Sequence, residues 1–244
     1  MGLSALILGA LLALAVASML VYAVLRPAKD ADAQKKGASF LLGFGSFLLN
    51  WFLWALSPVE GLLVSFGATP DHMNVVGLFC GLAAGVLVAL GRLEVGGWAI
   101  AAAGVADILD GRLARRLQVA SPYGKFIDST LDRFVESFSL LGAAWYLSDR
   151  PGGAFVAGAA LAGSLLVSYA QARGESVGVS GSGGLMQRAE RLILTCLACL
   201  LDPLVSQRLG VPAGTLLFWA LVAIAVPAWG TAIYRTVWIA RKLR

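Results

Sequence analysis

Hydrophobic residues gather in seven runs along the chain, and short polar segments separate them. The runs cover residues 3–25, 74–91, 95–106, 134–147, 154–169, 192–201 and 213–239. Several are shorter than the ~20 residues that a transmembrane helix needs, but polar residues at their ends could extend each helix to the membrane surface. The pattern therefore predicts an all-α, polytopic integral membrane protein with seven transmembrane helices.

A further apolar run, residues 40–56, is ambiguous, and the Lys and Arg residues decide its placement. Apart from Arg92, Arg150 and Arg208, they cluster in residues 26–36, 110–133, 172–191 and 235–244. Because cytoplasmic segments of membrane proteins are enriched in Lys and Arg, all four clusters are expected on the cytoplasmic side of the cell's plasma (inner) membrane. Residues 40–56 must then lie on the membrane as an interfacial or re-entrant helix, because a crossing helix would move the first cluster outside.

Composition excludes several other classes of protein. The chain is 59% hydrophobic and 14% charged, with a mean hydropathy of +0.80, whereas soluble domains have about 25% charged residues. A soluble fold of 244 residues could not bury so much apolar surface. We attribute the net charge of +5 to the cytoplasmic clusters, so no nucleic-acid partner is expected. The three cysteines lie in apolar runs without the spacing of a metal site.

The chain is expected to contain four parts. Residues 1–25 form a transmembrane anchor with its N-terminus outside, because no basic segment precedes this run as in a signal peptide. Residues 26–37 form a polar cytoplasmic linker, and residues 38–68 form the interfacial segment. Residues 69–244 form the core, in which all the candidate chemistry lies.

Four aspartates at one predicted membrane boundary are the main chemical signal. Asp107 and Asp110 are three residues apart, and Asp128 and Asp132 are four apart, so each pair lies on one face of a helix. The first pair ends one predicted helix and the second pair opens the next, so a helical hairpin would bring four carboxylates together. Each aspartate at membrane depth costs about 2.5–3.5 kcal/mol, and hard divalent cations would compensate that charge. Pairing with neighbouring arginines in an ordinary loop is the alternative.

The segment resembles the signature of the CDP-alcohol phosphatidyltransferase family. The signature reads D-x2-D-G-x2-A-R-x8-G-x3-D-x3-D, and residues 107–132 match all its specified positions. The resemblance runs from Thr69 to the C-terminus. It implies a six-helix membrane core, commonly dimeric, with an active site that opens to the cytoplasm and holds two Mg²⁺ or Mn²⁺ ions. It also implies transfer of a phosphatidyl group from CDP-diacylglycerol to an alcohol, with release of CMP.

The resemblance further implies a role for each matched residue. Asp107, Asp110 and Asp128 would be metal ligands, and Asp132 would be the general base and a further metal ligand. The CDP-lipid would be contacted by residues of the signature and of the stretch 69–74, which resembles the family's T-P-[ND]-x-x-T element: Asp71, Asn74, Gly111, Arg115, Ser121 and Gly124. Asn74 replaces the usual threonine of that element. The sole histidine, His72, is expected to have a helix-entry or interface role and not a catalytic one.

A second cluster of charged residues is expected on the same side of the membrane. It consists of residues 168–175 and 188–192, which resemble elements of the phosphatidylinositol-phosphate synthase branch of the family. There, Arg173, Arg188 and Arg191 would bind the phosphate of inositol 1-phosphate, because guanidinium forks match phosphate oxygens. Gln171 departs from that branch, which usually has lysine, and Ser180 stands where arginine is common.

Alternative functions remain open at this point. The acceptor could be glycerol 3-phosphate, serine or another polyol phosphate instead of inositol phosphate. The aspartates could also form the ion site of a cation transporter. Their position at one boundary, away from the midplane, and the presence of Gly111 and Arg115 favour the transferase.

Overall fold

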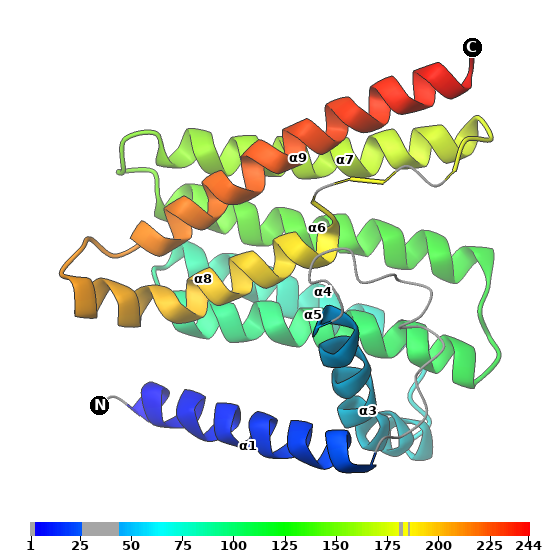
Figure 1. The fold of residues 1–244 in the computed structure, drawn as a ribbon, viewed down its shortest axis with the longest axis horizontal. Helices are drawn as coiled ribbons and strands as arrows, with labels where there is room; N and C mark the ends of the chain where they lie inside the picture. Colours follow the sequence, from blue (N-terminus) through cyan, green and yellow to red (C-terminus); the bar gives the residue numbers. More distant parts are fainter. Residues whose placement is uncertain (1–2, 26–43, 181–182, 185) are drawn as a thin grey trace. The chain divides into compact units, whose positions relative to one another are not determined.

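The computed structural model describes residues 3–25, 44–180, 183–184 and 186–244. Within them the chain is helical and has no strand, which confirms the predicted all-α class (Figure 1). The helices are α1 (Leu3–Leu25), α3 (Phe44–Ser65), α4 (Pro70–Ala89), α5 (Leu93–Arg116), α6 (Pro122–Tyr146), α7 (Gly153–Ser176), α8 (Arg188–Leu209) and α9 (Thr215–Lys242). The predicted linker, residues 26–37, lies outside the described residues.

The chain divides into two compact units, residues 1–68 and 69–244. In the first unit, the ring of Tyr22 on α1 packs against Phe47 and Trp54 of α3, with 5.5 Å between ring centroids in each pair. Helix α3 continues through Pro58 to Ser65, beyond the predicted end at residue 56. Its part from Phe47 to Ser65 is long and apolar enough to cross a membrane. The interfacial placement of this segment stays a prediction.

The six helices of the second unit pack in a closed ring. Helix α4 contacts α5 and α6, α6 packs on α7, α7 on α9, α9 on α8, and α8 on α5. The interior is filled by side chains with no exposed surface, which include Val88, Ile100, Leu217, Leu221 and Ile224. This arrangement confirms the six-helix core that the sequence predicts.

Glycines let α4 and α6 approach closely. A Cβ atom added at Gly142 would lie 2.1 Å from the carbonyl oxygen of Gly85, and one added at Gly81 would lie 2.8 Å from Val135. Small residues allow this backbone contact between membrane helices, where packing replaces the hydrophobic effect as the main attraction. The contact fixes α6, which carries two of the four aspartates, against α4.

Helices α5 and α6 are much longer than the apolar runs that predicted them. Helix α5 has 24 residues, or about 36 Å of helix, which exceeds the ~30 Å of the hydrocarbon layer. Helix α5 carries its two aspartates in its last three turns, and α6 carries its two in its first three turns. Among the described residues, five helices are long and apolar enough to cross a membrane, namely α3, α4, α7, α8 and α9.

Candidate active site

Three helix starts (α4, α6 and α8) and two helix ends (α5 and α7) bring the candidate residues to the same end of the ring. Helix α4 begins with a reciprocal cap, in which the Thr69 hydroxyl accepts from the backbone N–H of His72, and His72 Nδ1 accepts from the backbone N–H of Thr69. This confirms the helix-entry role expected for His72. Helix α6 begins at Pro122 behind the cap residue Ser121, and α8 begins at Arg188.

Three aspartates form a cluster that could hold a divalent cation. One carboxylate oxygen from each of Asp107, Asp110 and Asp128 lies within 4.8 Å of the other two. Asp110 is buried and the other two are half-buried. Carboxylate oxygens at such spacing are the donors that Mg²⁺ and Mn²⁺ prefer. The residues therefore fit the predicted metal centre.

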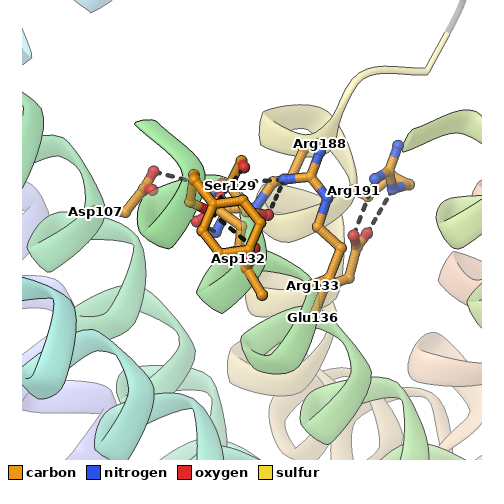
Figure 2. Close-up of polar contacts among 9 residues, drawn as sticks. Asp107, Ser129, Asp132, Arg133, Glu136, Arg188 and Arg191 are labelled. Carbon is orange, nitrogen blue, oxygen red and sulfur yellow. Dashed lines mark hydrogen bonds and ion pairs between the residues drawn. The ribbon is translucent and has the colours of Figure 1, made fainter. Parts of the chain in front are cut away.

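Arg188 joins this cluster to Asp132. Its Nη1 donates to Asp107 Oδ2 at 3.0 Å, and its Nη2 lies 2.7 Å from Asp132 Oδ1 (Figure 2). Arg133, the residue after Asp132, binds the other carboxylate oxygen more loosely, at 3.6 Å. One guanidinium from α8 thus compensates acids from α5 and α6 at once.

A second ion pair lies deeper between α6 and α8. Arg191 Nε donates to Glu136 Oε1 at 2.5 Å, and Arg191 Nη2 donates to Glu136 Oε2 at 3.0 Å (Figure 2). Arg191 Nη1 also donates to the carbonyl oxygen of Met186 at 3.3 Å. Arg191 was expected to bind the acceptor's phosphate, and here its fork is engaged by Glu136.

A narrow pocket opens between α4, α5, α6 and α8 at this cluster. Its polar lining consists of Asn74, Asp107, Asp110, Asp132 and Arg188. Asn74, expected to contact the CDP-lipid, therefore lies beside three of the four aspartates. Asp71, in the first turn of α4, is exposed and does not line this pocket.

The other residues expected at the CDP-lipid lie at the ends of α5 and α6. A Cβ atom at Gly111 would lie 3.4 Å from Arg115 Nη1, so the lack of a side chain there gives the guanidinium room. Ser121 caps α6, and its hydroxyl accepts from the backbone N–H of Gly124 at 3.1 Å. Arg115, Ser121 and Gly124 lie in the exposed or half-exposed part of the site.

The remaining acceptor residue, Arg173, lies near the end of α7. It is exposed, and its Nη1 approaches the Ser176 hydroxyl at 3.4 Å. Its neighbour Gln171 accepts from Arg235 Nη1 at 2.9 Å and donates to Glu175 at 3.1 Å. Arg188 thus contacts the aspartates directly. The described side-chain contact of Arg173 is with Ser176, in the same helix.

Two buried charged residues near the site were missed by the sequence analysis. Glu136 was not singled out, although it follows Asp132 by four residues and so lies on the same face of α6. Arg235 was used only as one of the basic residues that indicate the cytoplasmic side of the membrane. It is 5% exposed and donates to the carbonyl oxygens of Val167 and Gly183. The spacing of Glu136 was a usable signal, whereas no local pattern marks Arg235.

The fold and the site together define a helical membrane protein with a cluster of acidic metal-ligand candidates at one end of its helix ring. The chain belongs to the CDP-alcohol phosphatidyltransferase family, whose model matches residues 68–227. It is 36% identical to the phosphatidylinositol phosphate synthase of Streptomyces avermitilis over 210 residues, which are 81% of this chain and 85% of that protein. It is 30% identical to the archaetidylinositol phosphate synthase of Methanothermobacter thermautotrophicus, over 71% of this chain and 84% of that protein.

Solved structures agree with this assignment. The crystal structure of the Mycobacterium tuberculosis phosphatidylinositol phosphate synthase with CDP-DAG bound superimposes with a TM-score of 0.65 at 28% sequence identity, covering 75% of this chain and 92% of that one. A structure of the same enzyme in complex with manganese and citrate gives a TM-score of 0.65 at 30% identity, covering 74% and 88%. The chain is therefore an integral membrane transferase of this family.

Proposed function

We propose that the protein transfers the phosphatidyl group of CDP-diacylglycerol to a small phosphorylated alcohol, with inositol 1-phosphate as the preferred acceptor. The products would be phosphatidylinositol phosphate and CMP. The observation that carries the proposal is the meeting of Asp107, Asp132 and Arg188, which combines a metal-ligand cluster, a base and a phosphate-binding cation. The names of the relatives support the choice of acceptor.

The donor half of the site would be built on α5 and the start of α6. Asp107, Asp110, Asp128 and Asp132 would hold two Mg²⁺ or Mn²⁺ ions, which neutralise the pyrophosphate and the charge that develops on the leaving CMP. Arg115 would bind a phosphate oxygen, and Gly111 would let the nucleotide approach the helix. Asn74 would contact the same ligand from α4, with Asp71, Ser121 and Gly124 at the entrance.

Asp132 would act on the acceptor. Its carboxylate would accept the proton of the attacking hydroxyl, which then forms a bond to the β-phosphorus of the CDP-lipid. The bond between that phosphorus and the CMP oxygen breaks. Arg188, with Arg173 and Arg191 from the same cluster, would hold the acceptor's phosphate. Because Arg188 also binds Asp132, it would place the acceptor's phosphate close to the base.

The site is proposed to face the cytoplasm, where soluble phosphorylated alcohols are made. The polar segments beside the site carry most of the Lys and Arg residues, which favours that side. A homodimer is proposed from the family resemblance alone.

A panel of acceptors tests the proposed function. The purified protein, supplied with Mn²⁺ and CDP-diacylglycerol labelled in its lipid, is incubated with inositol 1-phosphate, glycerol 3-phosphate, serine or inositol, and the lipid products are separated. The expected result is labelled phosphatidylinositol phosphate and an equal amount of CMP with inositol 1-phosphate. A stronger product with glycerol 3-phosphate would reassign the acceptor, and no CMP with any alcohol would contradict transferase activity.

A further inference from the structure

Glu136 has no part in the chemistry proposed above, yet its carboxylate is among the most buried in the protein. It accepts hydrogen bonds from Arg191 at 2.5 and 3.0 Å. The exposed fractions of the two side chains are 2% for Arg191 and 6% for Glu136. Asp132 lies one helical turn earlier on α6, so both carboxylates project from the same face of that helix.

Stability alone is a weak explanation for this ion pair. Apolar side chains of similar volume are often at least as stabilising as a buried pair, because both charges lose their hydration. Ionisable groups inside membrane proteins are expensive and commonly mark a functional site. The position of the Glu136–Arg191 pair, next to the aspartate cluster, therefore calls for a functional explanation.

The two acids of α6 face two arginines of α8 in matched order. Asp132 pairs with Arg188 at 2.7 Å, and Glu136 pairs with Arg191. Arg191 also donates to the carbonyl oxygen of Met186, two residues before Arg188. The guanidinium of Arg191 thus links the residues after Arg188 to the backbone before it. Glu136 holds this guanidinium in place.

The segment before α8 is also held from the side of α9. The Thr231 hydroxyl accepts from the backbone N–H of Met186 at 3.3 Å, and Arg235 Nε donates to the carbonyl oxygen of Gly183 at 3.1 Å. From the side of α6, Glu136 binds Arg191, which in turn donates to the carbonyl oxygen of Met186. The start of α8 is therefore fixed between two neighbouring helices.

We propose that Glu136 is a positioning residue for the acceptor half of the site. By engaging Arg191 it fixes the first turn of α8 and keeps Arg191 away from Asp132, whose short contact is with Arg188. A neutral side chain at this position removes the carboxylate partner of Arg191, and Asp132 offers a replacement one turn away. Arg191 then competes with Arg188 for the carboxylate of Asp132, and both the phosphate-binding Arg188 and the base lose their orientation. The inference rests on the proposed function, since it concerns the same acceptor.

The test is a comparison of two Michaelis constants in Glu136→Gln. We expect the KM for inositol 1-phosphate to rise about tenfold or more, because a charge-assisted contact is lost, and the KM for CDP-diacylglycerol to stay unchanged. Glu136→Asp keeps the charge on a shorter arm and should give an intermediate rise. Inositol 1-phosphate added without CDP-diacylglycerol should raise the Tm of the wild type more than that of Glu136→Gln, which reports binding without turnover.

Asp202→Asn is the matched control, because Asp202 is a buried carboxylate at the other end of α8. It accepts from the backbone N–H groups of Gly214, Leu216 and Leu217. This variant should lower the Tm and leave both KM values unchanged. If Glu136→Gln behaves in the same way, Glu136 is merely structural and the inference is wrong.

Two further outcomes are also decisive. If Glu136→Gln does not fold, Glu136→Asp takes its place, and an unchanged acceptor KM in that variant overturns the inference. If the wild type transfers to no phosphorylated alcohol, the proposed function fails. Wild-type transfer with an unchanged acceptor KM in the Glu136 variants overturns the positioning role alone.

Discussion

Arg188 places one positive charge between carboxylates that come from two different helices. Its two terminal nitrogens reach Asp107 and Asp132 at 3.0 and 2.7 Å. At such distances the attraction between unit charges is several kcal/mol at the effective dielectric constant of a protein surface. The same planar fork fits the oxygens of a phosphate. Arg188 can therefore neutralise Asp107 and Asp132, and in the proposed function it would also bind the phosphate of the incoming alcohol.

Asp132→Asn is expected to abolish transfer while the protein keeps its fold. The amide cannot accept the proton of the attacking hydroxyl, and loss of a general base typically lowers the rate by about 10²–10⁴-fold. The measurement is kcat with labelled CDP-diacylglycerol, with Tm as the check on folding. Turnover near that of the wild type would show that another group acts as the base.

Asp110→Ala is expected to weaken the binding of Mn²⁺ together with activity. Asp110 is 4% exposed and shares the carboxylate cluster with Asp107 and Asp128, so its loss removes one ligand from the site. Titration of the purified protein with Mn²⁺, followed by electron paramagnetic resonance, measures the affinity without turnover. Asp149→Ala, at an exposed aspartate in the loop between α6 and α7, should bind Mn²⁺ as the wild type does. Equal affinities in both variants would contradict the metal centre.

The aspartate pairs could be predicted from the sequence because their spacing is local to one helix. The partner of Arg191 could not be predicted in this way, because Glu136 lies 55 residues away and on another helix. The same holds for the contact of Arg188 with Asp107, which spans 81 residues. Periodicity predicts which residues share a helix face, whereas pairing between helices depends on how the ring closes.

At the scale of elements, hydropathy located the helices, and polar residues extend α5 and α6 beyond their apolar runs, as the sequence predicts. The apolar run 95–106 predicted α5, which extends from Leu93 to Arg116. Hydropathy falls at Asp107 because the charged residues of the site begin there, but the backbone stays helical. The polar ends of α5 and α6 are the parts that carry the candidate chemistry. The candidate site residues of these two helices thus lie where the hydrophobic signal is weakest.

Gly142→Ala is expected to destabilise the protein by disrupting the contact between α4 and α6. The added Cβ atom would lie 2.1 Å from the carbonyl oxygen of Gly85, so the helices must separate, and overpacking of this kind costs about 1–3 kcal/mol. The measurement is the Tm of the purified variant, which should fall by several degrees. Gly158→Ala is the control, because nothing lies within 4 Å of the added atom. An equal Tm for both variants would show that the close approach is not required.

At the scale of the whole molecule, the orientation in the membrane can be measured from two loops at opposite ends of the ring. In a background in which Cys80, Cys196 and Cys199 are replaced by alanine, Asp149→Cys should react with an impermeant maleimide on intact cells. Val119→Cys, between α5 and α6, should react only after permeabilisation, because Lys and Arg cluster on that side. The reverse labelling pattern would place the site outside the cytoplasm.

The division into two units leads to a prediction about the N-terminal part. The family model begins at residue 68, the second unit begins at Thr69, and every candidate site residue lies beyond that point. Deleting residues 1–36 removes α1 but leaves the ring of six helices intact, so we expect kcat and both KM values to stay at their full-length values. The comparison uses protein purified from membranes in the same detergent, and a single symmetric peak in size-exclusion chromatography verifies folding. A truncated protein that inserts and folds but is inactive would mean that the deleted residues contribute to the site.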